Sequence, residues 1–499
     1  MSFLLGIDIG TSSTKAVIID EAGTVCGCAS ECYEMIRPQQ GWAEQAVEKW
    51  WLAVCNSVRA ALAAANCPTD AIAGIGLSGQ MHGTVMLDAA MHPVSRAIIW
   101  QDNRSAAEAS YVLERLGKRR LSEMTCNPLA PGFMAATILW MISHQPQTWE
   151  NVRQVLLPKD YIRMKMTGIA ATDPSDACGT SLFNTAAGEW NAELCAELAI
   201  DPAVLPPVIP SCSEAGRLLP DAASELGLPA GVPVAAGGGD LAMDAIGTGV
   251  VRPRTACSNI GTGGQFFVVS DRPVCDPELR VHTWCHSVAE RWINTGVVLS
   301  AGASLAWFCS KVAGYGGWDE ASADAASVPS GAGGLLFLPY LSGTRTPVID
   351  SAARGVFAGL HCGHDRASMA RSVMEGVVFA LREGMDVITE LGVEFDTLIV
   401  SGGGARSELW RQIQADIFNR PVKRALADEQ AAFGAALCAG VAAGVYSDVL
   451  SACKTAVRLS DEVIQPNRAN AERYEYLFGA FRRLYADNRE TFRMLASGM

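Results

Sequence analysis

Two pairs of short apolar runs, each pair joined by a small polar turn, stand about half a chain apart in the sequence. In the first pair, residues 3–9 and 14–19 flank the turn Gly10-Thr11-Ser12-Ser13. In the second, residues 257–260 and 265–269 flank a turn with three glycines. Short apolar runs on either side of a glycine turn predict β-hairpins. Their recurrence suggests a duplicated architecture, although two units alone are a weak repeat signal.

The segment between the two hairpins predicts a loop-rich connection and a domain boundary. Residues 202–233 contain seven prolines, and they lead into a strand over 232–236, three glycines and Asp240. A helical stretch over 241–246 follows, and we place the boundary near residue 249, between domains 1–249 and 250–499. Strands alternating with helices indicate an α/β protein.

Two further segments carry apolar positions at helical spacing. One is residues 407–418, in which Leu409, Trp410, Ile413 and Ile417 share a face. The other lies near the C-terminus, where apolar and charged positions alternate. Its apolar positions are Tyr474, Tyr476, Leu477 and Phe481.

The composition predicts a large buried core and argues against nucleic acid or a membrane as a partner. Of 499 residues, 49% are hydrophobic, and 52 acidic against 39 basic side chains give a formal charge of −13. Binding to phosphate backbones needs clustered cations, which this sequence lacks. The longest weakly polar run, residues 431–446, falls short of the ~20 residues of a membrane-spanning helix. No basic segment precedes the first apolar stretch, so we expect no secretory signal and a cytoplasmic location.

The sixteen cysteines are scattered through apolar surroundings. Their share of the chain is far below that of a disulfide scaffold. Clusters of Cys and His at residues 26–32, 282–286 and 361–364 each lack the second paired half of a zinc site. We therefore expect reduced thiols that act as small core residues, and no structural metal.

Residues 74–79 match the letters of a dinucleotide-binding fingerprint but not its structural context. Residues 80–87, which follow, have the pattern of another strand rather than of a phosphate-binding helix. The sequence also lacks a P-loop motif and the protein-kinase signatures. These nucleotide-binding classes are therefore excluded.

Three glycine-rich turns remain, and together they have a chemical use. They are Gly10-Thr11-Ser12, Gly261-Thr262-Gly263 and Gly402-Gly403-Gly404-Ala405. Such turns let bare backbone amides approach anionic phosphate oxygens closely, and the third turn precedes a predicted helix, whose N-terminal dipole adds to the effect. Any one of them alone is more often an ordinary turn.

Candidate acid–base groups lie at two predicted strand ends. Asp8 ends a buried strand where the first glycine turn begins, and Asp240 follows three glycines after another strand. Ligands of α/β domains bind at this edge. Asp240 is equally placed to cap the following helix, and Asp244, one turn later, is a reserve candidate. His82 is either a substrate contact or a structural histidine.

Together these pieces resemble the FGGY family of carbohydrate kinases over nearly the whole chain and in the same order. The Gln80-Met81-His82-Gly83 match is typical of the xylulose-phosphorylating branch of that family. The matching segments are residues 6–11, 41–45, 79–83, 100–104, 157–161, 175–177, 237–240, 337–343, 345–347, 355–360 and 402–407.

The resemblance implies two actin-like, ribonuclease-H-like ATPase domains facing across a cleft that closes on a sugar and ATP. It further implies Mg²⁺ as a cofactor, a ketose as substrate and a homodimer. Asp240 would be the general base, and Asp8 would organise Mg-ATP. The implied phosphate contacts are Thr11, Gly261 and Thr262, the nucleotide contacts Gly302, Gly403, Gly404 and Ala405, and the sugar contacts Met81, His82 and Asp240.

The chain departs from the family pattern at several positions. Leu241 stands where the family usually has Asn or Gln as a sugar contact, which removes a donor and an acceptor. The other departures are Thr137, Ala306, Thr344 and Ser368. None removes a carboxylate or a phosphate turn, so we expect catalysis to survive. Another ketose or a polyol as substrate, or a catalytically silent sugar-binding protein, stay open as alternatives.

Overall fold

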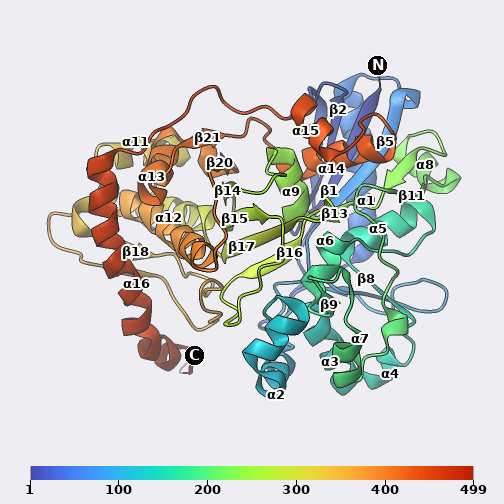
Figure 1. The fold of residues 1–499 in the computed structure, drawn as a ribbon, viewed down its shortest axis with the longest axis horizontal. Coiled ribbons are helices and arrows are strands. Elements are labelled where there is room, and N and C mark those ends of the chain that lie inside the picture. Colours follow the sequence, from blue (N-terminus) through green and yellow to red (C-terminus); the bar gives the residue numbers. More distant parts are fainter. Residues whose placement is uncertain (1, 498–499) are drawn as a thin grey trace.

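The computed structural model describes residues 2–497, which form two mixed β-sheets side by side with helices packed on them (Figure 1). The first sheet contains β1 (Phe3–Ile9), β2 (Ser13–Asp20), β3 (Val25–Cys32), β5 (Ile72–Gly79), β11 (Glu214–Arg217), β12 (Pro233–Ala235) and β13 (Gly238–Gly239). The second contains β14 (Thr255–Ile260), β15 (Gly264–Ser270), β16 (His282–Cys285), β17 (Trp292–Val298), β20 (Thr397–Ser401) and β21 (Val422–Arg424).

The two sheets repeat one strand arrangement. The first has the order β11-β12-β5-β1-β2-β3, with β13 beside β5, and the second has the order β16-β17-β15-β14-β20-β21. In each, an antiparallel hairpin (β1–β2, β14–β15) has a parallel strand on the far side of its first strand (β5, β20). The predicted duplication and both predicted hairpins are confirmed.

Alternation along the first hairpin places helices on both faces of its sheet. Leu5 and Ile7 of β1 pack into one apolar cluster with the first helices of the chain, whereas Leu4 lies in another on the opposite face. The first face is covered by α1 (Val47–Ala65), α5 (Pro158–Thr167) and α8 (Pro220–Leu226). The second is covered by α9 (Asp240–Thr248), α14 (Gln430–Ala442) and α15 (Val449–Ala456).

Helices α14 and α15 belong to the second half of the sequence yet pack on the first sheet, near the upper right of Figure 1. Glycines make this close approach possible. A Cβ atom added at Gly6 or Gly76 would lie 1.9 Å from a backbone oxygen of α14, and one at Gly434 would lie 1.9 Å from the Met243 oxygen of α9. The chain therefore returns to its first half after completing the second sheet.

The second sheet has one helix-covered face and one face toward the first half of the chain. The helices are α10 (Gly302–Trp307), α11 (Trp318–Ala326), α12 (Arg366–Glu390), α13 (Glu408–Phe418) and α16 (Arg468–Ser497). The other face contributes Phe267 and Ile399 to a cluster that also holds Leu241 and Ala245 of α9. A shared apolar layer thus joins the two halves.

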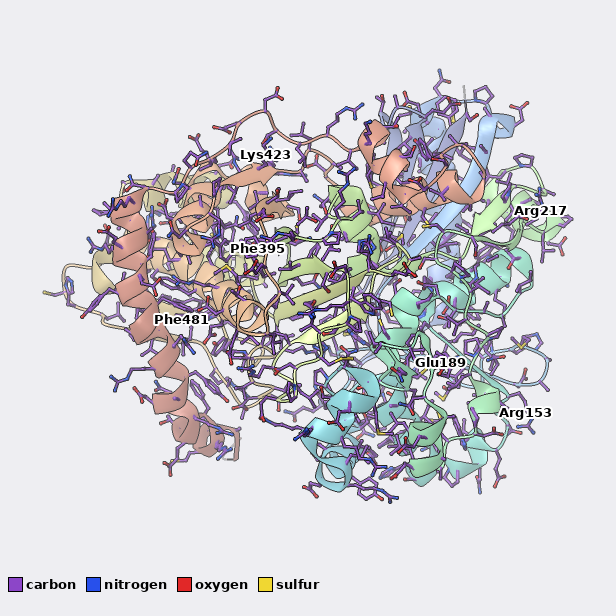
Figure 2. All side chains as sticks on the ribbon, in the orientation of Figure 1. Arg153, Glu189, Arg217, Phe395, Lys423 and Phe481 are labelled. Carbon is purple, nitrogen blue, oxygen red and sulfur yellow. A yellow bond between two sulfur atoms is a disulfide. The ribbon has the colours of Figure 1, made fainter. Side chains whose placement is uncertain are left out.

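The two predicted helical segments are confirmed. Residues 407–418 form α13, with Ser407 as its N-cap accepting from the backbone of Trp410. On α16, Tyr474 and Phe481 are buried, and Phe481 packs against Phe379 of α12 at 5.4 Å between ring centroids. Figure 2 labels Phe481 on this helix. Tyr476 is 81% exposed because it faces away from that helix stripe.

A group of helices lies in the lower part of Figure 1, below the first sheet. These helices are α2 (Ala106–Thr125), α3 (Met134–His144), α4 (Pro146–Trp149) and α7 (Ala192–Glu197), and α6 (Pro174–Ala177) lies above them beside β13. The strands outside the two large sheets are β4 (Glu44–Gln45), β6 (Val85–Leu87), β7 (Ala97–Ile98), β8 (Gln154–Leu156), β9 (Phe183–Asn184), β10 (Glu189–Trp190), β18 (Leu336–Leu338) and β19 (Val356–Ala358). After β5 the chain forms a loop and then β6, and residues 80–87 contain no helix, which confirms that residues 74–79 are not a dinucleotide-binding fingerprint.

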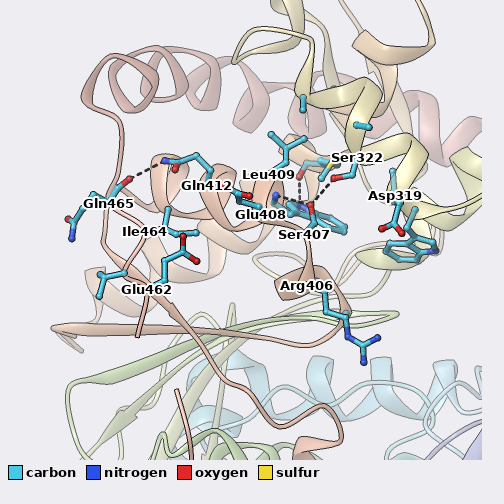
Figure 3. Close-up of a pocket in the computed structure, with 18 residues that line it drawn as sticks. Asp319, Ser322, Arg406, Ser407, Glu408, Leu409, Gln412, Glu462, Ile464 and Gln465 are labelled. Carbon is cyan, nitrogen blue, oxygen red and sulfur yellow. Dashed lines mark hydrogen bonds between the residues drawn. The ribbon is translucent and has the colours of Figure 1, made fainter. Parts of the chain in front are cut away.

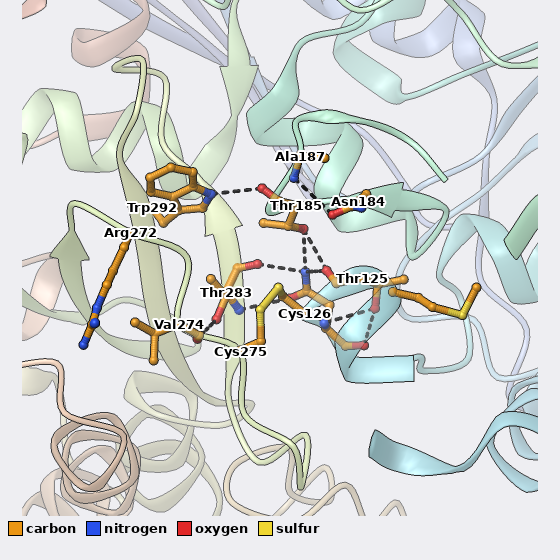
Figure 4. Close-up of a disulfide and its surroundings, with 12 residues drawn as sticks. Thr125, Cys126, Asn184, Thr185, Ala187, Arg272, Val274, Cys275, Thr283 and Trp292 are labelled. Carbon is orange, nitrogen blue, oxygen red and sulfur yellow. Dashed lines mark hydrogen bonds between the residues drawn. A yellow bond between two sulfur atoms is a disulfide. The ribbon is translucent and has the colours of Figure 1, made fainter. Parts of the chain in front are cut away.

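The expectation that every cysteine is a reduced thiol is wrong for two of them. Cys126, at the end of α2, forms a disulfide with Cys275, in the loop between β15 and β16 (Figure 4). The bridge links the two halves of the chain across a sequence separation of 149 residues, which left no local signal. The other fourteen cysteines are free.

The bridge does not stand alone. The side chain of Asn127 donates to the Thr283 carbonyl at 2.8 Å and accepts from the Thr283 amide at 3.1 Å. It therefore ties the end of α2 to β16 through a second, noncovalent link (Figure 4).

Within residues 2–497, no helix combines the length and apolar character that a bilayer crossing requires.

Candidate active site

A cavity of about 500 Å³ lies where the two hairpin turns meet. It is lined from both halves of the chain, and it brings together seven of the residues expected from the sequence. These are Asp8, Thr11, Met81, His82, Asp240, Gly261 and Thr262.

Asp240 is the first residue of α9 and follows β13 directly, so its carboxylate lies at the N-terminal end of this helix. Its Oδ1 accepts from the backbone amide of Leu241 at 2.8 Å. Burial raises the pKa of Asp240 to about 7, and the charges of Asp8 and Asp244 add to the rise. A carboxylate with this pKa is an efficient proton acceptor near neutral pH.

A buried ionic network holds the strand before Asp240 in place. The Gly239 amide donates to Ser175 Oγ at 3.1 Å, and that hydroxyl donates to Asp173 at 2.6 Å. Asp173 in turn pairs with Lys159 at 2.9 Å, and both side chains are fully buried. The position of the catalytic candidate therefore depends on charges deeper in the first half of the chain.

Asp8 of β1 faces the same cavity from the first sheet. Its Oδ1 accepts from Ser78 Oγ at 2.8 Å, whereas Oδ2 has no hydrogen-bond partner among the described residues. Burial raises the pKa of this carboxyl above its usual value, and the Ser78 bond opposes the rise. The unpartnered oxygen is free to take a ligand.

Asp244, the reserve candidate, is buried, whereas Asp8 and Asp240 are half-buried. Its Oδ2 accepts from the side-chain amide of Asn259 at 2.8 Å. Burial raises its pKa to about 6. Asp244 does not line the cavity, whereas Asp240 does.

His82 combines a structural role with an open acceptor. Its Nδ1 lies 2.6 Å from the Gly179 carbonyl oxygen, which only accepts, so Nδ1 carries the proton. Burial, with the charge of Arg345, lowers the pKa of His82 to about 3. The ring is therefore neutral, and Nε2 is an acceptor. The ring also stacks on Phe133 with centroids 3.8 Å apart.

Leu241 does not line the cavity. Its side chain is 2% exposed and lies in an apolar cluster with Met81 and Trp284. This position thus adds to the core behind the cavity and offers no polar group to a ligand.

The two hairpin turns present unpaired backbone amides. Within the described residues, the N–H groups of Thr11, Ser12, Thr262 and Gly263 have no hydrogen-bond partner. The Thr11 hydroxyl accepts from the Trp100 indole at 2.9 Å, which fixes the first turn. Clustered free amides of this kind form anion-binding nests.

A second cavity of about 1020 Å³ lies against the third glycine turn (Figure 3). Its apolar wall contains Leu305, Trp318, Met374 and Trp410, and Gly403 is part of the lining. Figure 3 shows Ser407 and Arg406 on the segment that leads into α13.

The other three expected nucleotide residues lie behind these walls. A Cβ at Gly404 would lie 2.7 Å from the Ile260 side chain, and Ala405 is 1% exposed. Gly302 donates to the Gly261 carbonyl at 2.9 Å, and a Cβ there would lie 3.1 Å from the Trp318 ring. Gly302 therefore packs between the second hairpin turn and the wall of the larger cavity.

Several lining residues were not expected from the sequence. Trp100, Asn259, Trp284 and Arg345 line the smaller cavity. Trp100 and Arg345 lie within segments that match the family, and that match was the available signal.

Two facing hairpin turns, a half-buried carboxylate at a strand end and a duplicated sheet define a member of the actin-like ATPase fold class. Models for the N-terminal and C-terminal domains of the FGGY family of carbohydrate kinases match residues 3–247 and 256–443. The chain belongs to this family and is an ATP-dependent sugar kinase.

Relatives of known name agree with this family. The chain is 37% identical over 492 residues to a xylulose kinase of Escherichia coli and 33% identical over 490 residues to one of Bacillus subtilis, covering 98% of both chains in each pair. A solved structure from Brucella ovis, described as a xyloylose kinase, superimposes with a TM-score of 0.90 at 36% identity, covering 98% of this chain and 100% of that one.

Proposed function

We propose that the protein transfers the γ-phosphoryl group of ATP to D-xylulose, giving D-xylulose 5-phosphate, with Asp240 as the general base. The observation that carries this is the placement of Asp240, whose pKa is raised to about 7, in one cavity with both amide-bearing turns. The xylulose kinase names of the relatives support the choice of sugar.

In the proposed reaction, the 5-hydroxyl oxygen of the sugar bonds to the γ-phosphorus while the bond to the bridging oxygen of ADP breaks. The hydroxyl proton passes to the Asp240 carboxylate. Phosphoryl transfer needs aligned reactants, neutralised phosphate charge and a base for the hydroxyl proton. The two hairpin turns, Asp8 and Asp240 would meet these needs at this cavity. Exclusion of water by closure prevents wasteful hydrolysis of ATP.

We assign the phosphate groups of ATP to the two hairpin turns and its adenine base to the larger cavity. The free amides of Thr11 and Thr262 would bind phosphate oxygens, with Gly261 completing the second turn. The apolar wall with Trp318 and Trp410 suits a flat aromatic base. Gly403 would contact the nucleotide directly, whereas Gly302, Gly404 and Ala405 would shape its site from behind.

Mg²⁺ fits this site through its phosphate ligands. In the part of the chain that the structure describes, no group of three or more His, Cys, Asp or Glu side chains forms a ready-made metal site. Mg²⁺ commonly takes one or two carboxylates and keeps water and phosphate oxygens as its other ligands. Asp8, with its unpartnered Oδ2, is the residue that would hold it, and the ion would neutralise charge on the phosphates.

We assign Met81 and His82 to the sugar. The bare Nε2 of His82 would accept a hydrogen bond from a sugar hydroxyl. Met81, 4% exposed beside Gly239, would supply an apolar contact next to Asp240. A cytoplasmic location and a homodimer are further proposals from the family resemblance, and sedimentation velocity tests the second.

The test is ADP release with Mg-ATP over a panel of D-xylulose, L-xylulose, D-ribulose, xylitol and a blank without sugar. The proposal predicts the highest kcat/KM with D-xylulose. Asp240→Asn should retain ATP binding but lose about 10²- to 10⁴-fold in turnover. Asp221→Asn, in the first turn of α8, is the matched control and should leave turnover unchanged.

Two outcomes would overturn the proposal in different ways. A much higher kcat/KM with another ketose or a polyol would make Leu241, which lacks a polar group, the first candidate for altered specificity. Tight sugar or nucleotide binding without ADP release would indicate a catalytically silent binding protein.

A further inference from the structure

If the proposed function holds, the site must recognise a ketose in its open-chain form. A 2-ketopentose closes its five-membered ring only through the oxygen on C5. Because the proposed reaction uses that same oxygen as the nucleophile, the reacting sugar must be open-chain. It therefore brings a free C2 carbonyl into the cavity, and a carbonyl oxygen only accepts hydrogen bonds.

A donor for that carbonyl is available in Arg345, which no other role in the site uses. Arg345 comes from the second half of the chain and lines the same cavity as Asp240 and His82. Its guanidinium has no hydrogen bond or ion pair to any described residue. It lies 5.3 Å from the ring centroid of Phe133, the ring on which His82 stacks, and 6.0 Å from that of Trp100.

Arg104 is another half-buried arginine that lies against aromatic rings, and it does have carboxylate partners. Arg104 lies 3.6 Å from the Trp42 centroid and also pairs with Asp102 and Glu44, each at 2.8 Å. A guanidinium that is half-buried between rings and lacks a carboxylate has lost water without gaining a protein acceptor. An oxygen atom of a ligand would replace the lost water as a hydrogen-bond acceptor for Arg345.

The backbone next to Arg345 is held firmly. Thr346 Oγ1 accepts from the Val297 amide of β17 at 2.9 Å. Its methyl carbon lies 3.1 Å from the place where a Cβ would stand on Gly296, and 3.6 Å from that on Gly384 of α12. A guanidinium carried on so fixed a backbone loses little freedom when it binds.

The charge of Arg345 persists at neutral pH although burial lowers its pKa to about 10. The two histidines near it, His82 and His282, are neutral because burial, together with this cation, lowers their pKa values. Arg345 therefore supplies a permanently charged donor to this cavity, and His82 Nε2 supplies a neutral acceptor.

We propose that Arg345 donates to the C2 carbonyl of the open-chain sugar and thereby selects ketoses over polyols. Reduction of the carbonyl to a hydroxyl adds a hydrogen that a guanidinium and aromatic rings do not accept well, and it changes the angle of the oxygen. The contact also draws a residue of the second half onto a sugar held by the first, which couples recognition to closure of the two halves.

The test compares D-xylulose with xylitol and D-arabinitol, its two products of reduction at C2. Arg345→Met should raise KM for the ketose at least about tenfold and shrink the ketose-to-polyol ratio of kcat/KM by about 10- to 100-fold. KM for ATP should stay within about twofold. Arg345→Lys, which keeps a donor, should recover part of the ratio.

Arg366→Met is the matched control, because Arg366 is exposed, lies over an aromatic ring and is paired with Glu320. This variant should leave the kcat/KM ratios of D-xylulose to xylitol and to D-arabinitol unchanged. Equal melting temperatures of the variants exclude misfolding.

An unchanged ketose-to-polyol ratio in Arg345→Met, with the wild type active on D-xylulose, overturns this inference alone. A loss in kcat together with a higher KM for ATP also overturns it and assigns Arg345 to the phosphates. If the wild type prefers another ketose, the same comparison is made with that sugar and its reduction products. A wild type inactive on every ketose overturns the proposed function and the inference with it.

Discussion

The side-chain amide of Asn259, on β14, donates a 2.8 Å hydrogen bond to Oδ2 of Asp244, on α9. One partner comes from each half of the chain. Asn259 lines the smaller cavity, and its Oδ1 would lie 2.6 Å from a Cβ at Gly402, at the start of the third glycine turn. Asp244 therefore supports Asn259 beside the turn to which we assign the nucleotide, and it does not itself line the cavity proposed for the sugar.

This relationship separates the two aspartates of α9 by their kinetic effects. Asp244→Asn keeps an acceptor for Asn259 and should lower kcat by less than about tenfold, whereas Asp240→Asn should lower it by about 10²- to 10⁴-fold. Asp244→Leu removes the acceptor and should raise KM for ATP. Steady-state kinetics of the three variants decide this. Near-normal turnover in Asp240→Asn with a collapse in Asp244→Asn would reverse the assignment.

A pH dependence follows from the same carboxylates. Because the pKa of Asp240 is raised to about 7, its basic form declines as pH falls through 7. We expect kcat/KM for the sugar to fall about tenfold per pH unit below that value. A flat profile between pH 5 and pH 7, with intact folding, would argue against Asp240 as the base.

The raised pKa of Asp240 also makes the free energy of unfolding depend on pH. Between the ordinary pKa of 3.8 and about 7, the folded protein binds a proton at Asp240 that the unfolded chain has released. The contribution of Asp240 to the free energy of unfolding therefore falls as pH rises through that window. Asp240→Asn should remove this slope, which denaturant titrations at several pH values would measure as a wild-type-minus-variant difference.

The fold was predictable from sequence where the signal was local. The hairpins around Gly10 and Gly261 followed from short apolar runs and glycine turns, and α13 from its apolar stripe. The packing of α14 on the first sheet was not predictable, because it depends on the close approach of Gly6 and Gly76 to backbone atoms more than 300 residues away in the chain. No local pattern records such a long-range approach. The Cys126–Cys275 bridge escaped for the same reason.

Some residues of the candidate site were predictable from local sequence signals, and others were not. Asp8 and Asp240 were found because strand ends and glycine turns mark them in the sequence. Trp284 carries no such mark, since a tryptophan in a strand is commonplace. Arg345 lies in a segment that resembles the family, but only the folded chain shows that both residues line the cavity with Asp240.

The buried network behind Asp240 predicts a large loss of stability from one substitution. Lys159 pairs with Asp160, Asp173 and Asp176 at 2.6, 2.9 and 3.3 Å, and all four side chains are fully buried. Lys159→Met leaves three buried carboxylates without this cation and should cost about 3–5 kcal/mol of unfolding free energy. Thermal unfolding measures the loss.

An exposed ion pair supplies the control for this substitution. Lys118→Met breaks a 3.2 Å pair with Glu278 whose side chains are 53% and 65% exposed, and it should cost no more than about 1 kcal/mol. Equal effects of the two substitutions would contradict the role given to burial. The folded fraction of Lys159→Met should also have a lower kcat, since Asp173 anchors Ser175 and through it the Gly239 amide.

The disulfide between the two halves predicts a redox-dependent stability. Denatured without reductant, the protein should take up label at fourteen cysteines, and after reduction at all sixteen. Closing a long loop in the unfolded chain typically stabilises a protein by about 2–4 kcal/mol, so reduction should lower the melting temperature of the wild type. Cys275→Ser should lower it to the same extent and abolish the effect of reductant. Cys362→Ser, at an exposed free thiol, should behave as the wild type does. Labelling of all sixteen cysteines before reduction, or a reductant effect that survives Cys275→Ser, would show that this bridge does not hold the halves together in solution.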